Sequence, residues 1–209
     1  AVGVLGPPFN IATKKLEIAY DADWQAQRLV LQGAIGNQPL LLTTKFGAQT
    51  ATSELFQNGQ KTVNTQVISP RAIILPDNFF AAYEVLAARL ASATPGTTLP
   101  IYRVPESEMA ATVDRVTSRR LVTPEGPVAI REFALTLMTP RGGFPVEIWT
   151  DDRQRLARLV LPVSSVVVIR DDLASVMTRE DHGQNPGDET LFIPANGFSL
   201  GATITKATS

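Results

Sequence analysis

Residues 76–93 read Pro76-Asp77-Asn78-Phe79-Phe80-Ala81-Ala82-Tyr83-Glu84-Val85-Leu86-Ala87-Ala88-Arg89-Leu90-Ala91-Ser92-Ala93 and have the period of an α-helix. Four bulky side chains recur at spacings of four, three and four residues, which places them on one helix face: Phe79, Tyr83, Leu86 and Leu90. Asp77 or Asn78 can cap the first backbone amides, and Pro95-Gly96 ends the segment. The pattern predicts one principal helix at about 77–93.

Nearly all the rest of the chain has the pattern of short β-strands separated by turns rich in Gly, Pro, Asn and Asp. The predicted strands are residues 16–20, 28–35, 40–46, 53–57, 61–68, 71–75, 99–104, 112–122, 128–138, 145–150, 155–161 and 163–170. Asn58-Gly59 supplies the positive φ values of a type I′ turn and predicts a β-hairpin. We therefore expect a mainly β (α+β) fold, in which a curved antiparallel sheet or half-barrel meander wraps one principal α-helix.

The chain divides into two parts by composition. Residues 1–180 form the expected β-rich domain with its helix. Residues 181–209 begin with a polar linker and end in a predicted hairpin, in which residues 190–194 and 198–205 are joined through Ala195-Asn196-Gly197. Because two strands alone are barely stable in water, this hairpin either docks on the preceding sheet or begins a further, truncated domain.

Composition excludes several classes of protein. The chain has 209 residues, 44% of them hydrophobic, and a formal net charge of −1, which gives no general attraction to nucleic acid. It has no cysteine, which excludes disulfides and thiolate metal sites. No apolar run approaches the roughly 20 residues of a transmembrane helix. The chain opens at Ala1 without methionine, as a mature exported protein or a trimmed chain would, and we expect a periplasmic or secreted protein whose signal peptide has been removed.

One sequence motif resembles a catalytic site. Gly197-Phe198-Ser199-Leu200-Gly201 fits G-x-S-x-G, the nucleophile elbow of serine hydrolases. The elbow needs a helix after the serine and a histidine downstream, but the residues that follow are strand-like. The only histidine, His182, lies upstream in the polar linker. We therefore predict no catalytic residue in this chain.

Metal and cofactor sites are not expected either. Asp21, Asp23 and the pairs Asp151-Asp152 and Asp171-Asp172 stand between predicted strands, where Asp usually forms turns. No calcium-loop pattern, P-loop or dinucleotide-binding glycine pattern occurs. Two acids distant in the chain can still converge in a cleft, so glycosidase or metal-dependent chemistry stays open as a minor hypothesis.

The aromatic and apolar face of the helix is the remaining candidate site. We expect a ligand-binding set between helix and sheet: Trp24, Phe79, Tyr83, Leu86, Leu90, Tyr102 and Trp149. Two interpretations are open, because these side chains can line a pocket for an apolar ligand or simply fill the core. A pocket would be concave, mostly apolar and marked by a few convergent polar groups.

The body of the chain, roughly residues 14–175, resembles the β-rich periplasmic domains related to the bacterial lipoprotein-localisation factors, and a related family of unknown function. The resemblance rests on the repeated hairpins, on the segment from Pro76 to Tyr83, and on Val146-Glu147-Ile148-Trp149-Thr150-Asp151 with Arg155-Leu156-Ala157-Arg158-Leu159. In those families this strand pair carries a Trp and a following acidic turn. The resemblance implies a half-barrel around a helix, in some cases carrying an acyl chain.

The tail, residues 189–204, is similar to the opening hairpin of secreted α/β-hydrolases, where an N-G or D-G turn joins two strands ahead of the catalytic sheet. Two functions follow as hypotheses. The first is a non-catalytic exported β-rich domain that binds an apolar or lipid-like ligand. The alternative is an N-terminal accessory domain of a larger secreted serine hydrolase, whose catalytic part would be a downstream partner domain.

Overall fold

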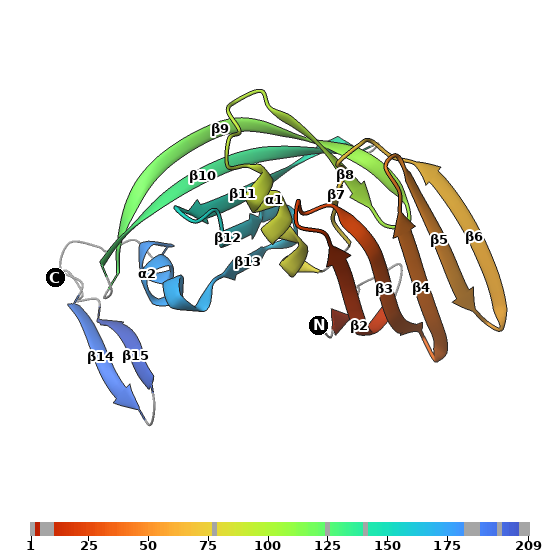
Figure 1. Ribbon diagram of the computed structural model, residues 1–209. Coiled ribbons are helices and arrows are strands. Elements are labelled where there is room, and N and C mark those ends of the chain that lie inside the picture. Colours follow the sequence, from red (N-terminus) through yellow and green to blue (C-terminus); the bar gives the residue numbers. More distant parts are fainter. Residues whose placement is uncertain are drawn as a thin grey trace.

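The computed structural model describes residues 3–4, 11–76, 79–123, 126–139, 142–181, 189–195 and 198–204. These residues form two large sheets, two short helices with a 3₁₀ turn before one of them, and a terminal hairpin (Figure 1). The six strands of the first sheet are neighbours in chain order: β1 (Gly3–Val4), β2 (Ile11–Tyr20), β3 (Ala26–Ile35), β4 (Gln38–Phe46), β5 (Thr50–Gln57) and β6 (Gln60–Val67).

The second sheet has seven strands: β7 (Ile73–Ile74), β8 (Thr98–Arg103), β9 (Ser107–Thr123), β10 (Gly126–Thr139), β11 (Gly142–Asp151), β12 (Leu156–Leu161) and β13 (Val166–Ile169). Its longest strands, β9 and β10, curve over the helix as a half-barrel (Figure 1). The predicted mainly β fold, with a curved antiparallel sheet wrapping a helix, is confirmed.

The meander is divided into two sheets rather than continuing as one. The division falls after β6, at the turn Ser69-Pro70-Arg71-Ala72, where the amide of Ala72 donates to the carbonyl of Ser69 at 3.2 Å. Pro70 has no backbone donor, and Arg71 has a φ of 61°, so the extended backbone of β6 cannot continue. β7 pairs in parallel with β8, whereas the other strand pairs described are antiparallel.

The predicted type I′ hairpin is confirmed at Asn58 and Gly59, whose φ values are 54° and 72°. The two strands that meet there pair Gln57 with Gln60 across the turn.

The principal helix is shorter than the predicted 77–93. A 3₁₀ turn, η1 (Phe80–Ala82), leads into α1 (Tyr83–Arg89), which has seven residues. The predicted caps Asp77 and Asn78 lie outside the described residues. At the other end, the amides of Leu90 and Ala93 close tight turns, and Arg131 of β10 donates to the carbonyls of Ala91 and Ala93. These bonds satisfy carbonyls that a longer helix would have used internally.

A second helix, α2 (Asp171–Asp181), was not predicted, because Asp171-Asp172 was interpreted as a turn and residue 181 as the start of the linker. The missed signal is the spacing of Leu173, Val176 and Met177, which lie three and four residues apart. Two aspartates in the first turn also favour a helix, because they interact well with its positive end.

Two apolar clusters pack against the long strands. α1 packs against Phe133, Leu135 and Ile148, whereas α2 packs against Ile130 and Trp149. Ile130 and Phe133 are an odd number of residues apart on β10, so the clusters lie on opposite faces of that strand. Among the described strands, β14 (Glu189–Ala195) and β15 (Phe198–Ile204) pair only with each other.

One hydrogen bond ties α1 to the sheet at an irregularity of the β11–β12 pair. The pairing register shifts between Trp149 and Thr150 of β11. Close to this shift, the amide of Leu156 donates to Glu84 Oε2 of α1 at 2.9 Å. Leu156 itself is buried, so its amide depends on a protein acceptor.

We expect Glu84→Ala to lower the free energy of unfolding by about 1–3 kcal/mol, because it leaves the Leu156 amide without its acceptor. Glu84→Gln keeps an acceptor oxygen and should lose less. The matched control is Glu17→Ala, which removes an exposed pair with Lys15 at 2.8 Å and should cost less than about 1 kcal/mol. Urea denaturation measures all three; equal losses for the alanine variants would contradict the role of Glu84.

Candidate functional site

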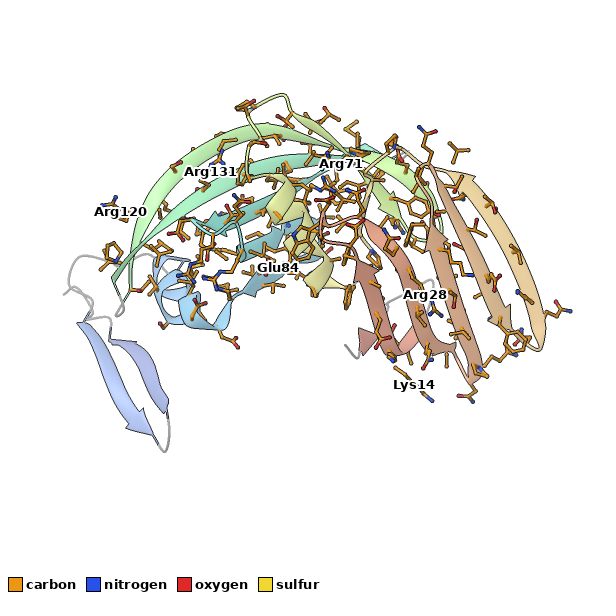
Figure 2. The ribbon with its side chains drawn as sticks, viewed as in Figure 1. Lys14, Arg28, Arg71, Glu84, Arg120 and Arg131 are labelled. Atoms are coloured by element: carbon orange, nitrogen blue, oxygen red, sulfur yellow. The ribbon has the colours of Figure 1, made fainter. Side chains whose placement is uncertain are left out.

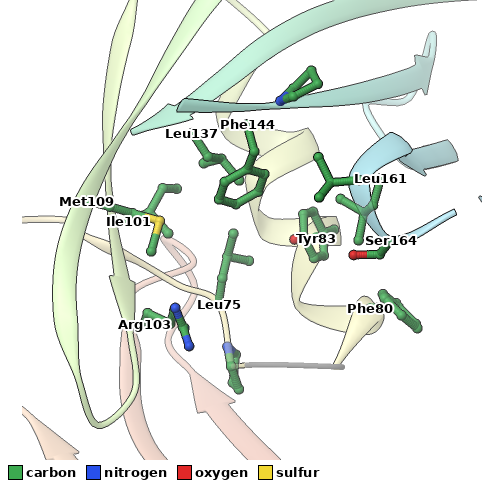
Figure 3. Close-up of a pocket in the computed structure, with 13 residues that line it drawn as sticks. Leu75, Phe80, Tyr83, Ile101, Arg103, Met109, Leu137, Phe144, Leu161 and Ser164 are labelled. Carbon is green, nitrogen blue, oxygen red and sulfur yellow. The ribbon is translucent and has the colours of Figure 1, made fainter. Parts of the chain in front are cut away.

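A cavity of about 180 Å³ lies between the helical segment and the concave face of the second sheet. Figure 3 shows the side chains of Leu75, Tyr83 and Phe144 converging on this space. Its walls are mainly apolar and come from both layers: Phe80, Tyr83, Ile101, Met109, Leu137 and Phe144. We call it the apolar cavity.

Strand alternation places the walls of the apolar cavity. Ile101 of β8 stands opposite Met109 of β9, and Leu137 of β10 stands opposite Phe144 of β11. Side chains directly opposite on antiparallel strands share a face, so each pair presents two apolar groups to the same side of the sheet. Four neighbouring strands of the second sheet therefore contribute side chains to the cavity.

Three polar side chains accompany this apolar lining: Tyr83, Arg103 and Ser164 (Figure 3). Arg103 follows Ile101 by two residues on β8, so it points to the same face of the sheet. Its guanidinium forms an ion pair with Glu106 at 3.0 Å and is partly exposed. Ser164 lies on the 3₁₀ turn Pro162–Ser164 and is exposed. The lining of the cavity is thus mostly apolar, with these three polar side chains among it.

Four of the predicted site residues belong to the helical segment, and they occupy different depths. Tyr83 lines the apolar cavity. Phe79 is partly buried against the apolar cluster between α1 and the second sheet. Leu86 and Leu90 have no exposed surface and are part of the core beneath α1. Of this face, only the first turn of the helix reaches the cavity.

The other three predicted residues lie elsewhere. Trp24 is 48% exposed and contacts the ring of Tyr20, with centroids 5.8 Å apart. Tyr102 is buried in the cluster of the first sheet, and its hydroxyl donates to Gln66 Oε1 at 2.7 Å. Trp149 packs with α2 on the other face of the second sheet. The structure does not bring these three side chains to the apolar cavity.

Sequence reasoning missed Arg103, Met109, Phe144 and Ser164, which line the apolar cavity. For Arg103 a signal was present, because Leu99, Ile101 and Arg103 alternate along one strand face that ends in a cation. Phe144 and Ser164 stand at the edges of predicted strands and gave no comparable signal. Their placement depends on the curvature of the sheet.

Trp149 is held between two cations. The guanidinium carbons of Arg119 and Arg158 lie 4.0 and 4.6 Å from its ring centroid. Both distances are within the range of cation–π attraction. This stack, with the buried Ala157 beside it, stabilises the surface on which α2 packs.

Asp151 organises the acidic turn between β11 and β12. Its Oδ1 accepts from the amides of Arg153 and Arg155 at 2.9 Å each, and its Oδ2 accepts from the side chains of Arg155 and Arg170 at 2.7–2.9 Å. Burial raises the pKa of Asp151, but the hydrogen bonds from Arg155 and Arg170 outweigh it and hold the pKa below the usual value. The carboxylate is therefore structural, as a turn-forming residue should be.

Within the described part of the chain, no group of three or more His, Cys, Asp or Glu side chains could hold a metal ion. Ser199 and Gly201 lie within β15, whereas a nucleophile elbow continues into a helix. His182 and Gly197 lie outside the described residues. None of the described helices is both long and apolar enough to cross a bilayer. No protein family, curated protein or solved structure matches this chain at a significant level.

The lowered pKa of Asp151 predicts a pH-dependent loss of stability. The charged form stabilises the fold fully above the unfolded-state pKa of about 4, and this contribution disappears as the pH falls through the lower folded-state pKa. Asp151→Asn should therefore cost about 1–3 kcal/mol near neutral pH, and less in strong acid.

Urea titrations of the wild type and the variant at several pH values measure this difference. The matched control is Asp152→Asn, because Asp152 is the exposed neighbour in the same turn. A difference between Asp151→Asn and wild type that stays constant down to strong acid would contradict the assignment.

Proposed function

We propose that this β-rich domain is a non-catalytic binder of an apolar, lipid-like ligand, which occupies the apolar cavity. The observation that carries the proposal is a partly open cavity between helix and sheet whose lining residues are mostly apolar, with three polar side chains among them. A periplasmic or secreted location is part of the proposal. It rests on the resemblance of the body to periplasmic half-barrel domains.

The size of the apolar cavity supports a ligand of limited length. Its volume of about 180 Å³ exceeds the roughly 150 Å³ of an engineered apolar cavity that binds benzene. Each methylene that leaves water contributes about 0.8 kcal/mol. A short or medium acyl chain can therefore fill the cavity, and a longer chain can extend through the open side.

Arg103 supports an anionic head group on that ligand. The guanidinium lines the cavity together with apolar side chains, and it also forms the ion pair with Glu106. A carboxylate on the acyl chain would meet this cation while the chain enters the cavity. Since Arg103 is partly exposed, its contribution to affinity is modest.

We expect decanoate to bind with a saturable signal, and Ser164→Trp to weaken this binding at least tenfold. Ser164 is exposed at the cavity, so an indole there covers the opening without entering the core. Displacement of a fluorescent fatty-acid analogue measures the affinity, and native mass spectrometry measures the stoichiometry.

The matched control is Val67→Trp, which adds an indole on β6 at a side chain that is 83% exposed. This variant should bind decanoate as the wild type does. Arg103→Met should weaken decanoate by up to about fivefold and leave decanol unchanged. Decanoate binding that survives Ser164→Trp undiminished would contradict the proposed site.

A second candidate is supported by the terminal hairpin. β14 and β15 pair with each other and with none of the other described strands. An isolated hairpin is marginally stable, so a partner surface would stabilise it. We propose as the alternative that the β-rich domain is an accessory domain of a secreted serine hydrolase. A downstream G-x-S-x-G followed by an acid and a histidine in the same reading frame would support it, and a stop codon directly after Ser209 would exclude it.

A further inference from the structure

A second cavity, of about 310 Å³, lies where the first sheet meets the second. Three connections line it: the β2–β3 turn at residues 21–25, the β4–β5 turn after Phe46, and the β6–β7 turn at residues 68–72. Polar side chains from these turns line it: Asp21, Gln25, Gln27, Ser69 and Arg71. It shares no lining residue with the apolar cavity. We call it the junction cavity.

Arg71 occupies a backbone position that does not suit it. It is the third residue of the turn Ser69-Pro70-Arg71-Ala72, and its φ is 61°. Type II turns have this geometry, with proline favoured second and glycine or asparagine third. A non-glycine residue with left-handed backbone costs free energy and persists where the surroundings require it. With this left-handed backbone, Arg71 is part of the wall of the junction cavity.

Gln25 is another residue that lines the junction cavity. Its Nε2 is buried and has no hydrogen-bond partner within the described part of the chain. Two more such atoms, Tyr20 Oη and Arg89 Nε, belong to residues that contact the same turn, through Trp24 and through the carbonyl of Asp23. Buried polar atoms are normally paired, so this group of orphaned atoms around one turn needs an explanation.

The carboxylate of Asp21 holds the β2–β3 turn together. Oδ1 accepts from the amides of Asp23 at 3.0 Å and Gln25 at 2.8 Å, and Oδ2 accepts from Gln27 Nε2 at 3.0 Å. Ser69 is likewise committed, since its hydroxyl is 2.6 Å from Glu108 Oε1. Among the polar side chains that line the junction cavity, Arg71 and Gln25 remain as donors without an acceptor in the described part of the chain.

A second guanidinium, that of Arg89, lies near Arg71. Burial and the nearby charge of Arg71 lower the pKa of the Arg89 guanidinium, and Asp23 and Asp21 offset only part of this effect. Two guanidinium groups thus stand near each other beside the β2–β3 turn. Figure 2 labels Arg71 close to the meeting point of the two sheets, far from Arg120 on the distal part of β9.

We propose that the junction cavity binds a small ligand through an oxyanionic group, a carboxylate or a phosphate, with Arg71 and Gln25 as the donors that hold it. The guanidinium forms charge-assisted hydrogen bonds with the anion, for which its planar fork is well suited. On binding, the Gln25 amide turns into the cavity, and its Nε2 gains the acceptor that the described part of the protein does not provide. This site is independent of the proposed lipid-like ligand.

The test is isothermal titration calorimetry with inorganic phosphate and, separately, malonate, at an ionic strength balanced with sodium chloride. We expect a single saturable site for at least one of the two anions. Binding of phosphate only assigns a phosphate-bearing ligand, and binding of malonate only assigns a carboxylate. Amide NMR shifts on saturation should concentrate at the three turns, including Gly47 and Ala72. Absence of binding by both anions overturns the proposal.

The decisive variant is Arg71→Gly. Glycine is favoured at this turn position, so the melting temperature should stay equal or rise while anion affinity falls about tenfold to a hundredfold. Gln25→Glu should also weaken binding, because it replaces a donor with a like charge. The matched control is Arg120→Ala, which removes one exposed positive charge far from the cavity and should leave affinity unchanged. Equal losses for Arg71→Gly and Arg120→Ala would show non-specific attraction and overturn the proposal.

Discussion

The fold of this molecule depends on the burial of one face of α1 against the curved second sheet, in which β11 and β12 lie nearest the helix. Leu86 and Leu90 have no exposed surface, and each contributes about 1.5–3 kcal/mol when it leaves water. A helix of seven residues is too short to be stable by itself in water. It persists because the sheet covers its apolar face, Glu84 binds the Leu156 amide, and Arg131 binds the carbonyls that follow the helix.

Both cavities lie at the borders of well-packed regions. The apolar cavity forms where η1 and the first turn of α1 cover the sheet incompletely, between Tyr83 and Phe144. The junction cavity forms where the chain leaves β6 and enters the second sheet through the turn at Arg71. A turn cannot fill space as a strand pair does, because its side chains diverge. Regular packing ends at these two places, and the space left there is large enough for a ligand.

Individual elements differed in how well their local pattern predicted them. The hairpin at Asn58-Gly59 was predictable because the turn type depends only on the two central residues. The sequence did not predict α2, because Asp171-Asp172 suits both a turn and the first turn of a helix. The helix forms because Leu173 and Met177 pack against the surface around Trp149. The expected ligand set mixed faces: Tyr102 belongs to the cluster of the first sheet, and Trp149 packs with α2 on the other face of the second sheet.

Local chemistry in the chain was sufficient to specify the strands, the turns, the apolar face of the helix and the absence of a cysteine-based site. These properties depend on neighbours within a few residues. Three features were specified only when distant segments packed together. They are the division into two sheets, the docking of α2 on the opposite face of β10, and the position of Arg71 and Gln25 at one cavity. Curvature and burial are properties of the whole sheet, so no short stretch of residues encodes them.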